Sequence, residues 1–574
     1  MKKSWKILSP DPREAEELAY GCGCHPIIGA LLINRGIRDK DEAEKFLNPS
    51  FYHLHSPFLL KDMDIAVERI STAIFNRERI LIFGDYDVDG VSGTALLLEF
   101  LTYAGADVIY YLPNRFTEGY GLSTTCVQEI AVPGNIALII TVDCGTSSLE
   151  AVKRAHESGI DVIITDHHEV PDELPPAFAI LNPKQPGCPF PFSSLSGVGV
   201  VFNLVLALRK HLREKRFWDK RPEPNLKAYC DFVALGTVAD IVPLKDENRI
   251  LVKGGLDILD CGERPGITAL KVVSGIAAEH TTTWDIAFRL APRINAAGRL
   301  DHASTGLELL RASDEERAQS LALRLNEENT SRQAIENNII SDVKRMLAAE
   351  PDWSSKKSLV LAKKGWHEGV IGIVASRLVE LYYRPVVLIA LTGGMAKGSA
   401  RSIEGFNLYQ ALEACGTLLE RFGGHEAAGG LYIRPENIHR FRTYFEDYVR
   451  KNTRPEDFQP KLVIDSLLSL EDISMELLEQ LEKMAPFGPG NPEPLFASSN
   501  IDVIYSRVVG TNHLQLQVRE SKNPDNRPVG AIIFNAGEDL KDIKRFDRIA
   551  YSLRLNRWKK RKSIQMVIKD FEIS

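Results

Sequence analysis

RILIFGDYDVDG, residues 79–90, joins a short apolar run to three aspartates at alternate positions. The run predicts a buried β-strand, and Asp85, Asp87 and Asp89 follow it directly. Carboxylates this close repel one another unless a positive charge compensates them, and hard divalent cations take carboxylate oxygens as ligands. A polar surface loop after a strand is the alternative. This stretch alone therefore predicts either a metal site or a solvated loop.

Other apolar runs between residues 76 and 245 also lead to acids or imidazoles. These residues are Asp143 after ALIITV, then Asp166, His167 and His168 after DVIIT, and Asp240 after FVALGTVA. Helix-like stretches such as VSGTALLLEFLTYAG separate the runs, which predicts a mostly parallel α/β sheet with helices on both faces. Ligands of such sheets bind beyond the carboxyl ends of the strands, so the recurrence favours a metal site there.

Composition limits the classes of protein that fit. A chain of 574 residues is too long for one core, and its 44% apolar and 26% charged residues are typical of globular domains. No apolar run approaches transmembrane length, and the N-terminus turns acidic before any signal-peptide core, so we expect a cytoplasmic protein without a membrane partner. The net charge of −7 requires that any nucleic-acid-binding residues be concentrated locally.

The middle of the chain is predicted to be helical. Its landmark is APRINAAGRLDHAST, residues 291–305, which places Arg293, Asn295 and Arg299 among small residues. From Asp314 to Ala349 no Gly or Pro interrupts a helical apolar pattern, which predicts one long helix between two lobes.

A second α/β unit is predicted from about residue 355 to 452. Within it, GSARSIEGFNL and RFGGHEAAGGL contain Ser399, Arg401 and His425 next to glycines. Glycine lets a backbone approach a phosphate closely, and arginine makes paired hydrogen bonds to oxyanions. Tight turns with a surface arginine are the alternative.

The last 115 or so residues have strand periodicity. MAPFGPGNPEPLF, residues 484–496, is dense in Pro and Gly and predicts a connection between domains. HLQLQV alternates strictly, and the end of the chain resembles a hairpin with a basic turn, so several short strands predict a small β-barrel. Basic and aromatic residues gather in this hairpin, as single-stranded nucleic acid requires, although a solvated hairpin is the alternative. They are Arg554, Arg557, Trp558, Lys559 and Lys560.

With these residues established, the chain resembles the RecJ single-stranded-DNA-specific exonucleases of the DHH phosphoesterase superfamily. The likeness runs from about residue 76 onward and consists of ordered motifs rather than one triplet. In this sequence they are GDYDVDG, TVDCGTS, TDHHE, SGVGVVF, ADIVPL, PRINAAGRL, GWHEGVIGIVASR, SARS and FGGHEAAGG.

The resemblance implies a function. Such enzymes degrade single-stranded DNA from the 5′ end to 5′ mononucleotides, with two Mn²⁺ or Mg²⁺ ions, in DNA repair and recombination. Single-stranded-DNA-binding protein and helicases are the implied protein partners. One alternative is a phosphodiesterase for short oligonucleotides or cyclic dinucleotides, as smaller DHH proteins are. Another is a non-catalytic DNA-binding scaffold, but scaffolds of this kind lose metal ligands that are present in this sequence.

The resemblance also assigns residues. Asp87 and Asp89 match ligands of the first motif, Asp143 a bridging carboxylate, His167 an imidazole ligand and Asp240 a carboxylate of the fourth motif. His168 matches the histidine that faces the scissile phosphate. Smaller members carry a histidine where this chain has Phe83, so Asp85 is the expected replacement. The matched substrate contacts are Arg115, Arg293, Asn295, Arg299, Ser399, Arg401 and His425, with Arg115, Ser399 and Arg401 at the 5′ phosphate.

The predicted organisation has five parts. They are an N-terminal helical segment (1–75), a DHH phosphoesterase domain (76–245), a helical region with a long connecting helix (246–350), a DHH-associated domain (351–453) and an OB-type barrel (454–574). The expected fold class is therefore α/β, with two α/β lobes joined by a long helix and a C-terminal β-barrel.

Overall fold

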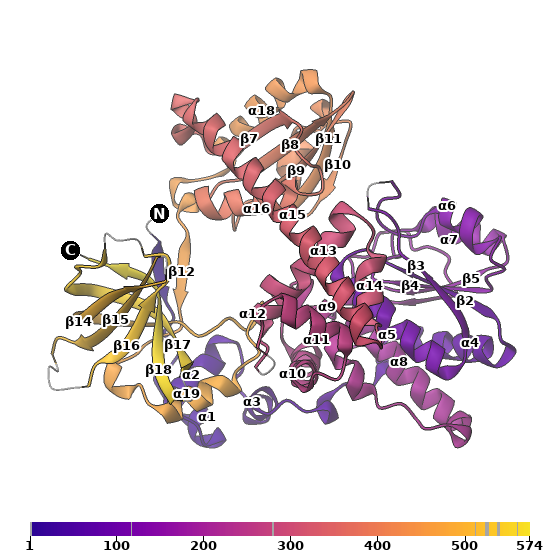
Figure 1. The fold of residues 1–574 in the computed structure, drawn as a ribbon, viewed down its shortest axis with the longest axis horizontal. Helices are drawn as coiled ribbons and strands as arrows, with labels where there is room; N and C mark the ends of the chain where they lie inside the picture. Colours follow the sequence, from indigo (N-terminus) through magenta and orange to yellow (C-terminus); the bar gives the residue numbers. More distant parts are fainter. Residues whose placement is uncertain are drawn as a thin grey trace. The chain divides into compact units, whose positions relative to one another are not determined.

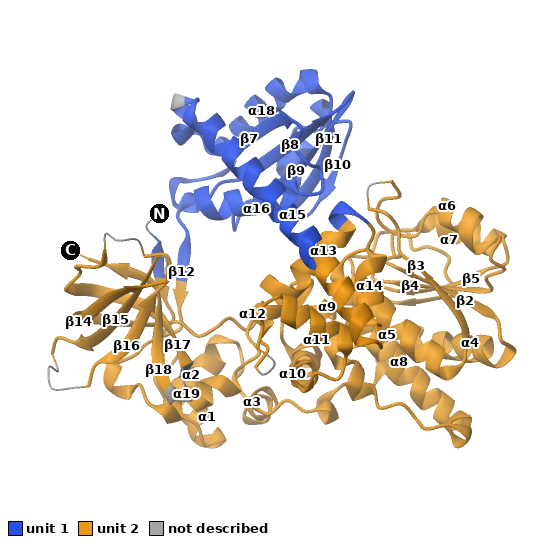
Figure 2. Cartoon of the chain, in the orientation of Figure 1, with its two compact units in different colours: residues 1–5, 299–301, 326–462 blue, residues 6–298, 302–325, 463–574 orange. Residues whose placement is uncertain are grey.

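The computed structural model describes residues 3–115, 117–277, 280–510, 512–522, 527–536, 540–558 and 561–573 (Figure 1). Of residues 351, 557, 558, 561 and 562 it describes the backbone alone. The chain divides into two compact units (Figure 2). The first is residues 1–5, 299–301 and 326–462, and the second is residues 6–298, 302–325 and 463–574.

The first sheet, in the second unit, has five parallel strands in the order β3-β2-β4-β5-β6. They are β2 (Arg79–Gly84), β3 (Asp107–Tyr111), β4 (Leu138–Val142), β5 (Asp161–Thr165) and β6 (Ala179–Leu181). Val142 of β4 lies opposite Gly84 of β2 and opposite Thr165 of β5. The carboxyl ends of these strands therefore share one edge, and the predicted parallel sheet is confirmed.

Helices cover both faces of this sheet. Successive side chains of a strand point to opposite faces, so Ile80 and Ile82 lie in one core while Leu81 and Phe83 lie in another. The first core includes residues of α4, α5 and α8, and the second includes residues of α6, η3 and α7. Their bounds are α4 (Met63–Asn76), α5 (Val88–Ala104), α6 (Thr124–Cys126), η3 (Val127–Ala131), α7 (Leu149–Glu157) and α8 (Gly197–Glu214).

The apolar run before Asp240 is not a strand but the helix α9 (Cys230–Ala239). A run buried all round has no periodicity, so its pattern cannot separate strand from helix. The helices that follow are α10 (Asp246–Cys261), α11 (Pro265–Val273), α12 (Thr283–Asp285), η6 (Ile286–Leu290), α13 (Ala291–Leu300), α14 (Ser304–Leu310) and α15 (Glu315–Ala348). The 34 residues of α15 confirm the predicted long helix. Among the described helices, none has the length and apolar character needed to cross a bilayer.

The first unit contains a second sheet, in the order β10-β11-β9-β8-β7. Only β7 and β8 pair in parallel, and α16 connects them as the sequence predicted. The elements are β7 (Leu359–Lys364), α16 (Ile371–Tyr382), β8 (Val386–Thr392), β9 (Met395–Arg401), α17 (Leu408–Ala414), β10 (Arg421–Gly424), β11 (Ala428–Ile433) and α18 (Ile438–Asn452).

The C-terminal strands close into the predicted barrel. The order β14-β15-β16-β18-β17 is completed by pairing of β14 with β17, while β13 (Ser466–Leu467) pairs in parallel with the first two residues of β14. The barrel strands are β14 (Phe496–Val509), β15 (His513–Glu520), β16 (Val529–Ile533), β17 (Arg545–Trp558) and β18 (Arg561–Glu572), and α19 (Met475–Lys483) precedes them.

The N-terminal helices share the core of this barrel, which the sequence did not predict. Leu18, Ile28 and Leu31 belong to the same buried cluster as Phe496 and Met566. The helices are α1 (Pro12–Cys22), α2 (Pro26–Asn34) and α3 (Lys40–Leu47), and β1 (Ser4–Ile7) pairs with β12 (Lys461–Ile464). The two ends of the chain thus stabilise one another by burying common apolar surface.

One arginine joins the helical region to the barrel. Arg249 of α10 is 2% exposed and donates hydrogen bonds of 2.9–3.4 Å to the carbonyls of Phe46 and of residues 483–486. The carbonyls of residues 483–486 lie at the C-terminal end of α19 and directly after it, where the helix dipole favours a cation. Its guanidinium also lies 3.9 Å from the centroid of the Phe46 ring, and burial lowers the pKa of Arg249 to about 9.

We expect Arg249→Ala to lower the free energy of unfolding by about 3 kcal/mol or more, because several buried carbonyls would lose their donors. Thermal unfolding followed by tryptophan fluorescence would measure the change. Arg38→Ala is the control, since Arg38 forms a solvent-exposed ion pair with Glu14. Equal unfolding midpoints for the two variants would contradict this role of Arg249.

Candidate metal centre

The aspartate stretch lies between β2 and α5. Asp87 is the N-cap of α5, and its Oδ1 accepts hydrogen bonds from the backbone N–H groups of Asp89 (3.0 Å) and Gly90 (3.1 Å). A carboxylate is favourable there because unpaired N–H groups and the helix dipole meet at this terminus. Asp85 directly follows β2 and is 4% exposed. The loop thus brings two carboxylates to the carboxyl edge of the sheet.

Asp89 is buried at the N-terminus of a second helix. Its oxygens accept hydrogen bonds from the backbone N–H groups of Gly197 (2.7 Å) and Val198 (2.9 Å), at the start of α8. A Cβ on Gly197 would lie 2.6 Å from Asp143 Oδ1, and a Cβ on Gly236 of α9 would lie 2.5 Å from Asp89 Oδ1. Glycine is therefore required at both positions for α8 and α9 to approach the carboxylates.

Two histidines follow β5, and Asp166 orients them. Asp166 Oδ1 accepts from the backbone N–H of His167 (2.8 Å) and from Nδ1 of His168 (2.7 Å), while Oδ2 accepts from the N–H of Thr146 (2.9 Å). Burial opposes ionisation of Asp166, but its hydrogen bonds with His168 and Thr146 outweigh that effect and lower its pKa. In the triplet Asp166, His167 and His168, the aspartate therefore positions the two histidines.

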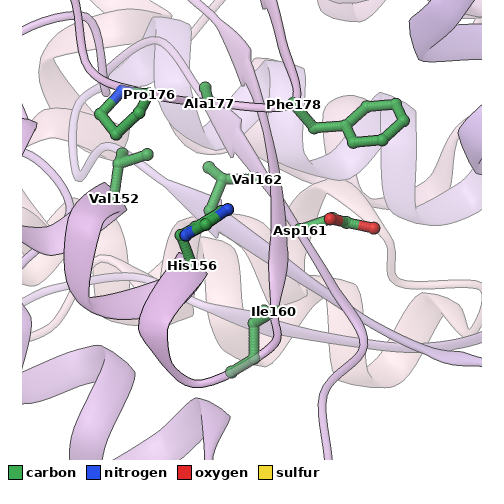
Figure 3. Close-up of a pocket in the computed structure, with 8 residues that line it drawn as sticks. All are labelled: Val152, His156, Ile160, Asp161, Val162, Pro176, Ala177 and Phe178. Atoms are coloured by element: carbon green, nitrogen blue, oxygen red, sulfur yellow. The ribbon is translucent and has the colours of Figure 1, made fainter.

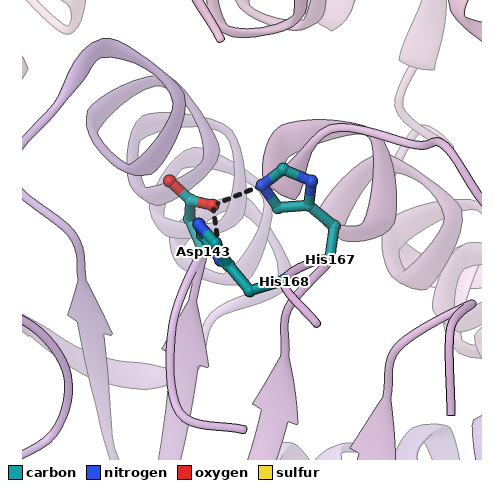
Figure 4. Close-up of side chains that lie close together, drawn as sticks. All are labelled: Asp143, His167 and His168. Carbon is teal, nitrogen blue, oxygen red and sulfur yellow. Dashed lines mark ion pairs between the residues drawn. The ribbon is translucent and has the colours of Figure 1, made fainter. Parts of the chain in front are cut away.

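One carboxylate oxygen of Asp143 faces both imidazoles (Figure 4). Its Oδ1 is 3.1 Å from His167 Nε2 and 3.9 Å from His168 Nδ1. His167 Nε2 is also 3.5 Å from Asp240 Oδ2 and 3.9 Å from Asp89 Oδ2. Asp240 is the C-cap residue of α9, Asp89 lies in the first turn of α5, and Asp143 follows β4, so two helix termini and one strand end place carboxylates around the His167 imidazole.

The described residues form three groups whose possible ligand atoms lie within 4.8 Å of one another. They are Asp85, Asp87 and Asp143; Asp89, His167 and Asp240; and Asp143, His167 and His168. Asp143 and His167 each belong to two groups. An arrangement of two neighbouring ions that share a carboxylate fits this overlap.

The electrostatics of the cluster also favour cations. Burial and then repulsion by Asp87 raise the pKa of Asp89 to about 7, and burial followed by repulsion from Asp89 raises that of Asp240 to about 9. Burial lowers the pKa of His167 to about 4, which leaves its imidazole neutral, as a metal ligand must be. Asp85 Oδ1, Asp143 Oδ1 and His167 Nε2 are buried and find no hydrogen-bond partner among the described residues. Oxygen and nitrogen donors of this kind fit divalent cations.

Comparison with known proteins agrees with this geometry. Models of three families match: the DHH family, N-terminal domain (residues 79–237), the DHHA1 domain (355–451) and the RecJ OB domain (464–570). A Bacillus subtilis relative named single-stranded-DNA-specific exonuclease RecJ is 36% identical over 100% of this chain and 71% of its own length. An Escherichia coli relative of the same name is 37% identical over 97% of both chains. The chain belongs to the RecJ family.

Solved structures of RecJ have the same fold. RecJ from Thermus thermophilus in complex with Mn²⁺ matches with a TM-score of 0.83 and 30% identity, over 100% of this chain and 80% of that one. The Mg²⁺ complex of the same protein matches with a TM-score of 0.78 and 29% identity, over 100% and 78% of the two chains.

The sequence did not predict two features near the centre, the contacts of Tyr120 and of Asn182. The hydroxyl of Tyr120 lies 3.1 Å from the carbonyl oxygen of Asp143 and 3.0 Å from Nδ1 of His168, and its ring meets the His168 ring edge to face. Asn182, just after β6, donates a 2.9 Å hydrogen bond to the carbonyl of His168. The sequence signal for Asn182 was available, because NPK follows the apolar run AFAIL. Tyr120 lies in a loop without periodicity and gave none.

The predicted substrate contacts belong to both units. In the second unit, the Arg115 guanidinium lies 5.1 Å from the centroid of the Tyr86 ring. Tyr86 stands between Asp85 and Asp87 in the sequence. Arg293 and Asn295 are half-buried on α13 of the same unit. The first unit contains Arg299, Ser399, Arg401 and the exposed His425.

Ser399 and Arg401 form a small polar group in the first unit. Arg401 donates hydrogen bonds to Ser399 Oγ (3.3 Å) and Ser376 Oγ (3.2 Å), and Gly372 of α16 lies against both side chains. The group lies beside the first turn of α16, where the helix dipole favours an anion. The group is therefore compatible with the predicted phosphate contact.

The predicted nucleic-acid-binding residues of the barrel are described only in part. Arg554 of β17 is half-exposed and pairs with Glu493 at 2.7 Å. Arg557 and Trp558 end β17, but their side chains lie outside the described residues, as do Lys559 and Lys560 entirely.

A pocket of about 220 Å³ lies away from the metal centre (Figure 3). It is lined by residues of α7 and by Asp161, the first residue of β5. Because β5 begins there, the pocket lies at the edge opposite the carboxylates. It therefore takes no part in the centre.

With metal removed by a chelator, we expect the free energy of unfolding to fall as pH rises. The pKa values of Asp89 (about 7) and Asp240 (about 9) lie above the usual carboxyl value near 4. From about pH 4 to about pH 9 the folded chain therefore holds more protons than the unfolded chain. Saturating Mn²⁺ should remove the dependence, since the ions replace the protons. Unfolding midpoints across this interval, with EDTA and with Mn²⁺, would test it. Equal pH dependence in both would contradict the assignment.

We expect Tyr120→Phe to lower kcat on single-stranded DNA by about ten- to a hundredfold while KM changes little, because His168 loses a positioning contact. Steady-state kinetics would measure this effect. Tyr20→Phe on α1, at a 91% exposed position, is the control. A kcat for Tyr120→Phe within about twofold of the parent would show that the hydroxyl is dispensable.

Proposed function

We propose that this protein is a metal-dependent exonuclease that hydrolyses single-stranded DNA from the 5′ end to 5′ mononucleotides, in DNA repair and recombination. The observation that carries the proposal is the buried carboxylate and imidazole cluster at one sheet edge, where three polar atoms have no hydrogen-bond partner within the described part of the chain. Two relatives that match 100% and 97% of this chain are named single-stranded-DNA-specific exonucleases, which supports the class of reaction. The family model of the RecJ OB domain over residues 464–570 favours long strands over dinucleotides as substrates.

Six residues would hold the ions, which are Mn²⁺ or Mg²⁺, the metals of the two matched complexes. They are Asp85, Asp87, Asp89, Asp143, His167 and Asp240. When bound, two such ions neutralise the charge of a phosphodiester and lower the pKa of water so that it can attack. We assign Asp143 the position between the ions, because it alone among the carboxylates belongs to two of the groups.

His168 has a different role in this proposal. Burial opposes its protonation, but the hydrogen bond and charge of Asp166 prevail and raise its pKa, so the imidazole is more readily cationic. Asp166 holds Nδ1, and the side chain is 43% exposed. A cationic ring would stabilise charge that develops on a phosphoryl oxygen. Arg115, Arg293, Asn295, Arg299 and His425 are the proposed further contacts to the strand.

The resemblance carries two further expectations. We infer that the protein acts in the cytoplasm, and that single-stranded-DNA-binding protein and helicases supply its substrate. A strand-specific exonuclease needs unwound DNA, which supports this class of partner. In the barrel, Arg554, Arg557, Trp558, Lys559 and Lys560 remain the proposed contacts to the strand.

We expect Asp143→Ala to remain folded and to lose more than about a hundredfold in hydrolysis, beyond the usual effect of changes outside the ligand shell. Release of nucleotides from end-labelled single strands, with Mn²⁺, Mg²⁺ or EDTA, would measure it. Asp172→Ala, an exposed position, is the control and should match the parent. Activity of Asp143→Ala within about tenfold of the parent would contradict the two-ion assignment.

If Ser399 and Arg401 hold a terminal phosphate, Arg401→Ala should weaken the preference for 5′-phosphoryl over 5′-hydroxyl ends by about tenfold or more, the value of a charged hydrogen bond. Competition between the two substrates would measure the preference. Arg421→Ala, exposed on β10 of the same unit, is the control. An unchanged preference in Arg401→Ala would exclude the contact.

A further inference from the structure

Two motifs of the sequence meet beside the metal centre, SGVGVVF at the start of α8 and GTVAD at the end of α9. The first provides the backbone N–H groups that hold Asp89, and the second ends in Asp240. Both carboxylates belong to one ligand group with His167. The separation of these two helix ends therefore decides whether this group can close around one ion.

A hydrogen bond between two buried hydroxyls joins the two helix ends. Ser196 Oγ lies 2.8 Å from Thr237 Oγ1, and both side chains are fully buried. Ser196 is also the N-cap of α8, where its Oγ accepts a hydrogen bond from the N–H of Gly199 (3.2 Å). A hydroxyl that accepts this bond can still donate its own hydrogen, so Ser196 can serve both helices.

The contact between α8 and α9 at this point is close. A Cβ on Gly236 would lie 2.7 Å from Cγ1 of Val198, in addition to its clash with Asp89. Apolar packing of this kind has no directional preference, whereas a hydrogen bond weakens when its length or angle changes. The hydroxyl pair thus adds a directional restraint to the packing of the two helices.

A second tie joins the same two segments. Nδ2 of Asn248, on α10, donates to the carbonyl of Ser194 (2.7 Å) before α8 and to that of Pro243 (3.0 Å) after Asp240. Between Asp240 and Pro243, Ile241 has φ +62°, a conformation that a β-branched residue seldom adopts. Such strain persists where the surrounding contacts over-determine the backbone. The fold therefore holds the backbone next to Asp240 in place at an energetic cost.

We propose that the Ser196–Thr237 hydroxyl pair is a positioning element for one metal ion, because it sets the separation of Asp89 and Asp240. The two hydroxyls are not ligands in this proposal and act through the two carboxylates. The proposal rests on the proposed function and adds to it the residues that set the affinity of one ion. The binding of an ion that contacts neither Asp89 nor Asp240 should not depend on the pair.

Binding of Mn²⁺ to the metal-free protein tests the proposal without turnover. Titration with the free ion followed by electron paramagnetic resonance would give the affinity of each ion. Thr237→Val keeps the branched shape and removes the hydroxyl, so we expect it to weaken the binding of one ion about ten- to a hundredfold and to leave the other unchanged. Thr237→Ser keeps the hydroxyl and should retain the affinity. Ser196→Ala removes the same hydrogen bond from the α8 side and should reproduce the effect of Thr237→Val.

Two further variants separate positioning from general destabilisation. In an Asp240→Asn background, Thr237→Val should have no further effect on either ion, because the energies of residues in one network are not additive. Ser498→Ala is the matched control, since Ser498 Oγ lies 2.8 Å from the Tyr551 hydroxyl in another buried hydroxyl pair, in the barrel. It should lower the unfolding midpoint and leave both Mn²⁺ affinities as in the parent.

Unchanged affinity for both ions in Thr237→Val would overturn the proposal. So would an equal loss for both ions, a loss in Thr237→Ser as large as in Thr237→Val, or a loss that adds to that of Asp240→Asn. A similar loss in Ser498→Ala would attribute the effect to destabilisation and would also overturn it. The outcome is separate from that of the proposed function. Absence of metal-dependent hydrolysis by the parent would overturn the function, while the Mn²⁺ affinities would still report on the hydroxyl pair.

Discussion

Mutual repulsion of buried carboxylates is the constraint on which this structure depends. Asp85, Asp89 and Asp143 are each 4% exposed or less at one sheet edge, and burial raises the pKa of each. Bringing like charges together in a low dielectric costs free energy unless donors or cations compensate it. The α5 and α8 termini provide part of the compensation through backbone N–H groups to Asp87 and Asp89. Asp143 Oδ1 has no such donor among the described residues, which supports the proposed shared cation at this carboxylate.

The same constraint explains features that lie outside the cluster. Gly197 and Gly236 allow α8 and α9 to approach the carboxylates. Asp166 uses one carboxylate oxygen to accept hydrogen bonds from both His167 and His168, which orients them. Asp166 is therefore part of the family triplet without lying among the proposed ligands. The helix termini, the strand ends and the triplet thus all position or compensate the buried carboxylates at one sheet edge.

Much of the centre could be predicted because parallel strands end at one edge. The runs before Asp85, Asp143 and Asp166 have strand-like lengths and polar ends, so their meeting was foreseeable. The run before Asp240 had the same composition but forms a helix, since a fully buried run has no period that separates the two. Tyr120 and Arg249 were missed because their partners are distant in sequence, and only the folded chain brings them together. The packing of the N-terminal helices into the barrel core was hidden for the same reason.

The number of Mn²⁺ ions bound per chain tests the central claim most directly. Titration of the metal-free protein, with free Mn²⁺ followed by electron paramagnetic resonance, would give that number. The overlap of the groups at Asp143 and His167 predicts two ions per chain at saturation. It further predicts that Asp143→Asn weakens the binding of both ions, because this carboxylate belongs to two of the groups. Saturation at a single ion, or two ions whose binding is unaffected by Asp143→Asn, would contradict the account.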